Sequence, residues 1–222
     1  MNTDDGVEFF GGTVNVKHLV LTGNKDDSLD WTMGWVGKVQ FVVIQQYDDQ
    51  GNNGIEADNF DKDYSSIPRS QPVISNMTLI GTSAASPKGG EGILLRRGTG
   101  AHIYNSIVTG FKGSCFDIDD KETFENADEE TGIVIENVML DCSVPISKSD
   151  DDLFDVETWF LGQMGNEFAS PMLNGWVPAV ESPVHGIGES PLDLFFDDVD
   201  FIGAIGGPED DWTSGWTISE IN

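Results

Sequence analysis

The chain has 222 residues, 38% of them hydrophobic, which suffices for one sizeable core and makes a single domain over residues 1–222 the simplest expectation. Its 39 Asp and Glu residues against 11 Lys and Arg give a formal net charge of −28, so its field repels nucleic acid and anionic membrane surfaces and attracts cations. No apolar run is long enough to cross a membrane. Nucleic-acid binding and membrane insertion are therefore excluded, and the acidity indicates either cation sites or a solvating surface suited to salty water.

Two kinds of apolar segment alternate along the chain. The shorter kind starts at residues 6, 28, 54, 92 and 115, and these starts differ by 22, 26, 38 and 23. Each is followed by a longer segment, and the longer kind lies at residues 16–23, 39–46, 74–81, 103–110, 135–142 and, once more, 195–203. Apolar and polar residues alternate within the segments, which is typical of strands with one buried face.

A repeat of about 22 residues has the size of one coil of a parallel β-helix, in which like positions of successive coils stack. The pattern predicts an all-β protein, a right-handed parallel β-helix (a solenoid). Coils are expected at about residues 4–142 and 186–206. The stacking predicts an inward column of Val7, Leu29, Ile55, Ile93 and Phe116 beside an outward column of Glu8, Asp30, Glu56, Leu94 and Asp117.

The repeat breaks near residues 143–190, where we expect an irregular insertion of loops and one short helix over 143–185. The segment 151–165, "DDLFDVETWFLGQMG", is the one predicted to be helical, either within a long loop or over the open end of the core. The last coil at 186–206 is followed by a Trp-rich tail at 207–222.

The two cysteines occupy related positions. Cys115 opens a short strand and Cys142 closes the long strand of the same unit, about one turn of the solenoid later. This spacing predicts a disulfide, which suits an oxidising, extracellular setting. The alternative is a pair of small buried apolar residues.

The acidic columns carry most of the chemistry in the sequence. In register, Asp4 and Asp26 stack with Asn52, and the next column contains Asp5, Asp27 and Asn53. Stacked carboxylates about 5 Å apart repel one another unless they take up protons, bind cations or face water. A calcium site is predicted, because calcium takes carboxylate oxygens; the alternative is a solvated acidic face. Its expected ligands are Asp5, Glu8, Asp26, Asp27 and Asp30.

Two similar aromatic motifs occur far apart, "WTMGW" with Trp31 and Trp35, and "WTSGW" with Trp212 and Trp216. Trp side chains spaced by four residues around a Gly can form a stacking platform for sugars. They can equally cover the ends or corners of the core. The fingerprints of serine hydrolases, zinc proteases, P-loop proteins and dinucleotide-binding proteins do not occur in the chain.

The stretches "DDGVEFFGGTVNV", "DDSLDWTMGW", "GIEADN", "PRSQPVISNMTLIG" and "GILLRRGTGAHIYNSIVTGF" resemble a group of largely uncharacterised bacterial secreted or surface proteins with the pectate-lyase-like right-handed β-helix. The resemblance spans nearly the whole chain. It implies the same fold, an extracellular or cell-surface location, and a chain that is the C-terminal part of a longer polypeptide.

Within this resemblance, "DDSLD" is similar to the calcium site of one class of pectate lyases. The resemblance implies calcium ligation by Asp26, Asp27 and Asp30, with Asp4 or Asp5 as a fourth ligand. In those enzymes a Lys or Arg removes a proton from a uronate bound to calcium. The candidates for that base here are Lys38 and Arg69, with the pair Arg96 and Arg97 expected further along the solenoid axis, and none falls clearly at the matching place.

The sequence therefore favours a non-catalytic extracellular structural module that binds calcium and either self-associates or binds glycans. Self-association is included because a solenoid without a polar cap leaves strand edges and core residues open to another chain. The alternative is a calcium-dependent lyase acting on acidic polysaccharide.

Overall fold

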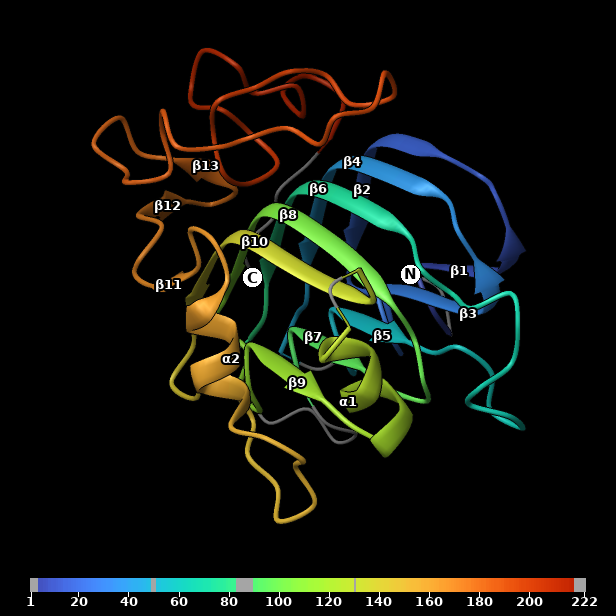
Figure 1. Ribbon diagram of the computed structural model, residues 1–222. Helices are drawn as coiled ribbons and strands as arrows, with labels where there is room; N and C mark the ends of the chain where they lie inside the picture. The colour runs from blue at the N-terminus through green and yellow to red at the C-terminus, as the bar shows by residue number, and fades with distance from the viewer. Residues whose placement is uncertain (1–3, 49–50, 83–89, 130, 218–222) are drawn as a thin grey trace.

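Two parallel β-sheets that face one another form the body of the protein, as Figure 1 shows for the computed structural model, which describes residues 4–48, 51–82, 90–129 and 131–217. The chain passes from one sheet to the other and back in each coil. The first sheet has the order β1 (Val7–Gly12), β3 (Leu29–Trp35), β5 (Ile55–Ala57), β7 (Ile93–Leu95) and β9 (Phe116–Ile118). The second has the order β11 (Glu167–Phe168), β10 (Ile133–Asp141), β8 (Ala101–Thr109), β6 (Val73–Ile80), β4 (Lys38–Gln45) and β2 (Val16–Thr22). The predicted all-β parallel β-helix is confirmed.

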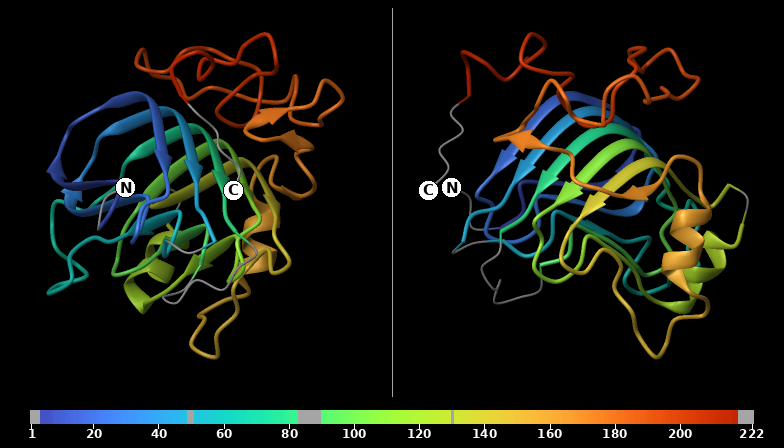
Figure 2. Two further views of the ribbon diagram at one scale, coloured as in Figure 1. Left: turned by 180° about the vertical axis from the view of Figure 1, so that it is seen from behind. Right: turned by 90° about the vertical axis from the view of Figure 1, so that its left-hand side faces the viewer.

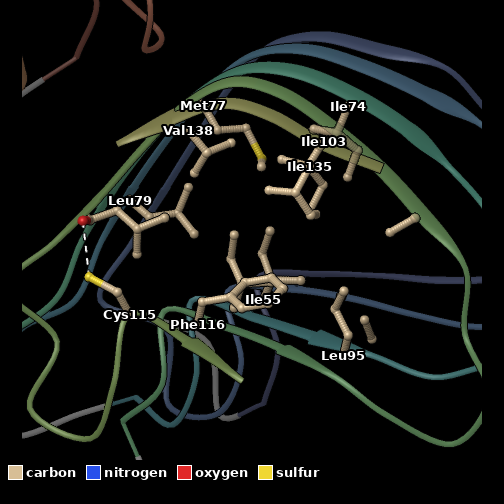
Figure 3. Close-up of a cluster of buried hydrophobic side chains, with 14 of the residues drawn as sticks. Ile55, Ile74, Met77, Leu79, Leu95, Ile103, Cys115, Phe116, Ile135 and Val138 are labelled. Carbon is tan, nitrogen blue, oxygen red and sulfur yellow. Dashed lines mark hydrogen bonds between the residues drawn. The ribbon is translucent and has the colours of Figure 1, made fainter. Parts of the chain in front are cut away.

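The inward column has the predicted register. Val7 pairs with Leu29, and the pairing continues through Ile55 and Ile93 to Phe116. From Leu29 onward these side chains are fully buried, and each buried Leu or Ile contributes about 2 kcal/mol through the apolar area it removes from water. Figure 3 shows Ile55 and Phe116 pointing across the core toward a matching column of the second sheet, namely Ile74, Ile103 and Ile135.

Helix α2 (Val156–Gly162) closes the C-terminal end of this core, as predicted for residues 151–165. Asp155 caps the helix by accepting the Thr158 N–H at 2.7 Å. The Phe160 ring is buried 5.7 Å from that of Phe116. A second helix, α1 (Lys121–Ala127), was not predicted, because its seven residues contain too few apolar positions to give a helical period. Neither helix is long or apolar enough to span a membrane, and the described residues contain no other candidate.

The prediction of a last coil at 186–206 is wrong. The described part of this region contains no named strand; it runs across the outer face of the second sheet, where Figures 1 and 2 show it in orange and red. The physical reason lies in that sheet, whose outward positions include Val43, Ile107 and Met139, all buried beneath the chain. A short hairpin of β12 (Leu173–Asn174) and β13 (Val177–Pro178) carries the first covering residue, Trp176, in its turn. The covering residues beyond the hairpin are Val184, Ile202, Ala204 and Ile205.

We call residues 181–217 the covering segment. Side-chain amides of the second sheet hold its backbone: Gln40 exchanges two hydrogen bonds with Asp197, and Asn76 donates to the carbonyl oxygens of Phe201 and Gly203 at 3.0 and 3.2 Å. Asn76 has a φ of +58°, a left-handed conformation that Asn tolerates better than most residues. The segment is thus bound by specific polar contacts as well as by apolar burial.

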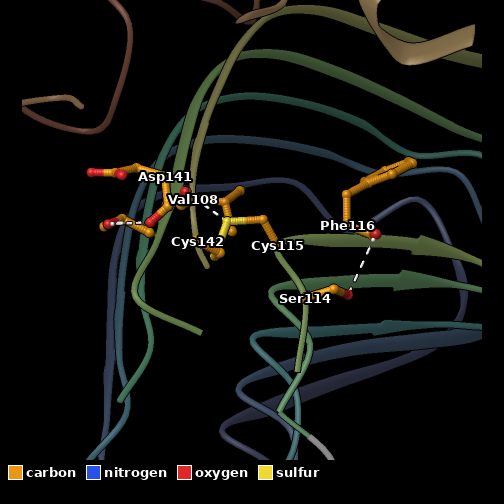
Figure 4. The surroundings of a disulfide bond; sticks show 7 residues. Val108, Ser114, Cys115, Phe116, Asp141 and Cys142 are labelled. Carbon is orange, nitrogen blue, oxygen red and sulfur yellow. Dashed lines mark hydrogen bonds between the residues drawn. A yellow bond between two sulfur atoms is a disulfide. The ribbon is translucent and has the colours of Figure 1, made fainter. Parts of the chain in front are cut away.

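The predicted disulfide between Cys115 and Cys142 is present (Figure 4). Their Cα atoms lie 5.6 Å apart, and the bond joins the start of β9 to the end of β10, so it ties the two sheets together at the C-terminal coil. Both cysteines of the chain are used in it.

Candidate metal centre on the first sheet

The outward column of the first sheet also has the predicted register. Glu8 pairs with Asp30, Asp30 with Glu56, Glu56 with Leu94 and Leu94 with Asp117. These positions follow the inward column by one residue, and successive residues of a strand point to opposite faces. The fold therefore places carboxylates on neighbouring strands, one above the other.

A ladder of side-chain to backbone hydrogen bonds runs beside this column. A carboxylate oxygen of Asp5 accepts the Asp27 N–H at 3.1 Å, and Asp27 in turn accepts the Asn53 N–H at 2.8 Å. Asn53 continues the ladder to the Glu91 N–H at 3.3 Å. The recurrence of Asp or Asn at this position thus has a structural cause, because each side chain binds the backbone of the next coil.

The structure brings the predicted ligands together. Asp5, Asp27 and Asp30 each present a carboxylate oxygen within 4.8 Å of the other two, and Asp4, Asp5 and Asp26 form a second such group. Asp5 belongs to both groups, so the two are continuous. Glu8, the remaining predicted ligand, pairs in register with Asp30.

Burial and mutual repulsion raise the pKa values of three of these carboxyls, those of Asp30, Asp27 and Glu8. For Asp30, burial followed by the charges of Glu56, Glu8 and the neighbouring aspartates raises the pKa to about 9. Burial and the charge of Glu56 raise the pKa of Asp27 to about 7, although the hydrogen bond from Asn53 opposes this. Burial and the charge of Asp5 also raise the pKa of Glu8. The group is therefore costly to ionise without a cation.

The donor set fits a hard divalent cation. Its ligand atoms are all carboxylate oxygens, which calcium and magnesium prefer over nitrogen or sulfur. Asn52, whose N–H donates to the Asp26 carbonyl, has a buried side-chain oxygen without a hydrogen-bond partner among the described residues. An unpaired amide oxygen of this kind is a further suitable ligand for calcium.

Two basic residues that the sequence placed further away adjoin the acidic column. Arg96 binds both Glu56 and Asp58, with 2.8 Å to the latter, and Arg97 binds Asp58 at 2.7 Å. Glu56 is the register partner of Asp30. The sequence indicates where Arg96 lies in the repeat. It does not indicate that the Arg96 side chain extends back to contact residues of the preceding coil.

The two predicted candidates for a catalytic base lie elsewhere. Lys38 starts β4 in the second sheet and forms an ion pair with Asp193 of the covering segment. Arg69 lies in the loop before β6 and contacts Glu129 at 3.5 Å. Neither side chain is held against the acidic column by these contacts.

Of the two interpretations of Trp31 and Trp35, the sugar platform is wrong and the packing role is confirmed, because both side chains are fully buried in the core. The indole N–H of Trp31 donates to Thr99 at 3.0 Å, and Trp35 stacks on Phe9 with ring centroids 4.2 Å apart. In the tail, Trp212 packs its ring 6.0 Å from Trp216, which is 60% exposed. A role in sugar binding stays a prediction for this second pair alone.

The stacked parallel sheets, the inward and outward columns and the closing helix place the chain among the parallel β-helix proteins. A family model described as a pectate-lyase-like β-helix domain matches residues 1–180, and the chain belongs to this family. The match includes the acidic cluster and ends just before the covering segment. Comparisons with curated proteins and with solved structures gave no match.

Proposed function

We propose that the chain is a non-catalytic, extracellular or cell-surface β-helix module that binds calcium on the outer face of its first sheet and holds acidic polysaccharide there. The observation that carries the proposal is the group of Asp5, Asp27 and Asp30, whose carboxylate oxygens lie within 4.8 Å of one another. The module is also proposed to self-associate.

Calcium is the proposed ion because the cluster needs a partner of high positive charge. The raised pKa values of Asp27 and Asp30 reflect burial first and then the charge of Glu56 and other neighbouring carboxylates, so the ionised forms of both groups are costly without a cation. A bound calcium ion would remove this cost and accept the carboxylate of a uronate as an additional ligand. Acidic polysaccharide is therefore the class of ligand that fits the face.

The location rests on the disulfide and the surface charge. A disulfide such as Cys115–Cys142 persists in oxidising surroundings, and those lie mostly outside the cytosol. A net charge of −28 is compatible with high salt and with calcium-rich surroundings.

The second candidate function is a calcium-dependent lyase on acidic polysaccharide, for which Arg96, bound to Glu56 of the acidic column, would be the candidate base. Burial alone lowers the pKa of the Arg96 guanidinium, but the hydrogen bond and charge of Asp58, together with Glu56, outweigh it and raise the pKa. A guanidinium held so firmly in its protonated form is suited to binding an anion and poorly suited to removing a proton. This supports the binding module over the enzyme.

The test is titration calorimetry with short oligouronates in calcium, magnesium or chelator, with a neutral oligosaccharide of the same length as control. Binding that needs calcium and is weakened at least tenfold in Asp27→Asn is expected. Absence of oligouronate binding in calcium would overturn the proposal. The lyase is tested by the ultraviolet absorbance of unsaturated products: their appearance with wild type and loss in Arg96→Ala would establish the enzyme instead.

A further inference from the structure

The aromatic motif at residues 212–216 lies in the covering segment and takes no part in the proposed calcium site. Trp212 and Trp216 stack with ring centroids 6.0 Å apart and an interplanar angle of 29°. The Trp216 indole N–H donates to the Trp212 carbonyl oxygen at 2.6 Å, which fixes the orientation of the outer ring. Since Trp212 lies against one face of this ring and Trp216 is 60% exposed, the opposite face is presented to solvent.

A stack of rings on the second sheet supports this pair. The rings of His18 in β2 and Phe41 in β4 stack with centroids 5.0 Å apart, and Phe41 is buried. The His18 ring meets that of Trp212 edge to face, with centroids 4.9 Å apart. The Trp212 indole N–H donates to the Ala204 carbonyl oxygen at 2.7 Å. The exposed ring of Trp216 is thus the last of a series of rings that begins in the sheet.

The register of the second sheet explains why rings gather at this end of it. His18 and Phe41 have φ of +58° and +61°, and the next coils have Asn76 and Asn105 at the same left-handed position, with φ of +58° and +48°. The two asparagines hold the covering segment through hydrogen bonds to its backbone. The first coil holds the segment through a ring contact instead, from His18 to Trp212. The aromatic motif is therefore positioned by the same column that positions the rest of the covering segment.

The turn that carries the exposed ring is acidic. The backbone carbonyl of Asp210 accepts the Trp212 N–H at 3.1 Å. The Asp211 carboxylate accepts the Thr213 N–H at 3.0 Å, and the Thr213 carbonyl accepts the Thr217 hydroxyl at 2.8 Å. These contacts keep both acids in one compact turn with the two rings, and the Asp210 side chain is exposed.

The charge of this region discriminates between ligands for the ring. The covering segment contains nine Asp and Glu residues and no Lys or Arg. Lys17, the basic residue next to His18 in β2, is paired with Asp197 at 2.9 Å. An anionic sugar is therefore repelled from the turn, whereas a protonated amino group is attracted to it. The face of an indole ring is suited both to the apolar C–H face of a sugar and to a cation.

We propose that Trp216 is a stacking platform for the amino-sugar residues of a cationic polysaccharide, with Asp210 and Asp211 as partners for their protonated amino groups. A sugar ring fits this surface better than a single basic side chain does, because the exposed surface is the flat face of one ring, and compact cations are held best by several rings that enclose them. The site goes beyond the proposed function. It does not involve calcium, and it takes a ligand of the opposite charge to the one proposed for the acidic cluster.

Titration calorimetry in calcium with short glucosamine oligomers tests the inference, beside N-acetylated oligomers of the same length and oligolysine of the same charge. The glucosamine oligomers are expected to bind, and Trp216→Ala is expected to weaken their binding at least about tenfold, because it removes the stacking surface. Asp210→Asn and added salt should each weaken binding as well, since both reduce the attraction between opposite charges. The matched control is Phe10→Ala, which removes a ring of the same exposure, 61%, from β1 and should leave binding unchanged.

Absence of glucosamine binding by the wild type overturns the inference. Equal affinity for oligolysine, or binding that survives Trp216→Ala, overturns it too, because the interaction would then be a general attraction to an acidic chain. Equal affinity for the N-acetylated oligomer overturns the assignment to amino sugars. Trp216→Ala should leave oligouronate binding in calcium as it is in the wild type, which separates this site from the acidic cluster. Circular dichroism of each variant verifies that the fold is retained.

Discussion

Asp27 lies between two coils and serves both, since its carboxylate accepts the Asn53 N–H of the next coil at 2.8 Å while its own N–H donates to Asp5 of the coil before. The same carboxylate belongs to the group of three that would hold a cation. The Asp27 side chain thus has both a structural hydrogen bond and a role in the proposed cation site. A substitution that keeps a hydrogen-bond acceptor for the Asn53 N–H but removes the negative charge distinguishes these two roles.

Asp27→Asn is that substitution. We expect it to abolish most of the rise in melting temperature that calcium gives the wild type, because binding of calcium to the folded state alone stabilises it by mass action. In chelator at neutral pH the variant should melt at or above the wild-type temperature, since it removes a carboxyl whose pKa burial and the charge of Glu56 raise to about 7. Thermal melts at fixed ionic strength measure both effects.

The control for this variant is Asp117→Asn. Asp117 stands in the same outward column, and burial and the charge of Glu91 likewise raise its pKa to about 7, but it lies at the other end of the sheet and outside the two acidic groups. It should leave the calcium effect intact. An equal loss of the calcium effect in both variants would argue against the cluster as the site.

Without calcium, stability should fall as pH rises from about 4 to about 9. In that window the folded state retains protons on Asp27 and Asp30, whose pKa values burial and neighbouring charges raise from 3.8 to about 7 and about 9, whereas the unfolded chain has released them. Each carboxyl that differs fully between the two states adds a slope of about 1.4 kcal/mol per pH unit. Urea unfolding in chelator, compared between wild type and Asp30→Asn, should give a shallower slope for the variant; parallel curves would contradict the raised pKa.

Arg96→Ala should destabilise the protein by about 2 kcal/mol. The change leaves Glu56 and Asp58, both largely buried, without a main partner for their charge, although Arg97 still binds Asp58. Lys121→Ala provides the comparison, because Lys121 pairs with Glu125 in full solvent and such pairs contribute little. Equal unfolding free energies for the two variants would show that the Arg96 cluster is not coupled to the fold.

Breaking the Cys115–Cys142 bond should cost about 2–4 kcal/mol, since the crosslink restricts the unfolded chain across 27 residues of sequence. Denaturant unfolding of the double variant Cys115→Ala/Cys142→Ala, next to wild type with and without a reductant, measures this. The reductant should affect only the wild type. An unchanged midpoint in the double variant would mean that the coil at β9 is held by packing alone.

Asn76→Ala should loosen the covering segment. The variant loses two hydrogen bonds to residues 201 and 203 and places alanine at φ +58°, a left-handed conformation that alanine tolerates less well than asparagine, for a total of about 2–3 kcal/mol. Asn76→Gly loses the same bonds without the backbone strain and should lie between wild type and the Ala variant. Limited proteolysis, read at cleavage sites after residue 180, should follow the same order.

The regular part of the fold could be predicted from the sequence because each coil repeats the same alternation of apolar and polar residues. Leu29, Ile55 and Ile93 stand at the same point of successive units, and strand pairing then fixes their register and that of the acids one residue later. The disulfide followed from the same register. These predictions depended on local alternation and on contacts between neighbouring coils.

The covering segment could not be predicted in this way. Its run "FFDDVDFIG" has the alternation of a strand, and nothing local distinguishes a strand that buries its apolar residues inside the solenoid from an irregular chain that buries them outside it. A signal was nevertheless present in the second sheet, where Val43, Ile107 and Met139 are apolar at positions that a bare solenoid would expose. The position of Arg96 was missed for a related reason, since a long side chain can reach a neighbouring coil.

The covering segment also determines the order in which the protein can be completed during synthesis. Coils pair with their immediate neighbours, so they can form one after another as the chain leaves the ribosome. Gln40, in contrast, binds Asp197 across 157 residues, and the outward apolar row of the second sheet stays open until that distant part emerges. A nascent solenoid with an uncovered flank is a substrate for chaperones, and translation speed over the codons of the covering segment sets how long that state lasts.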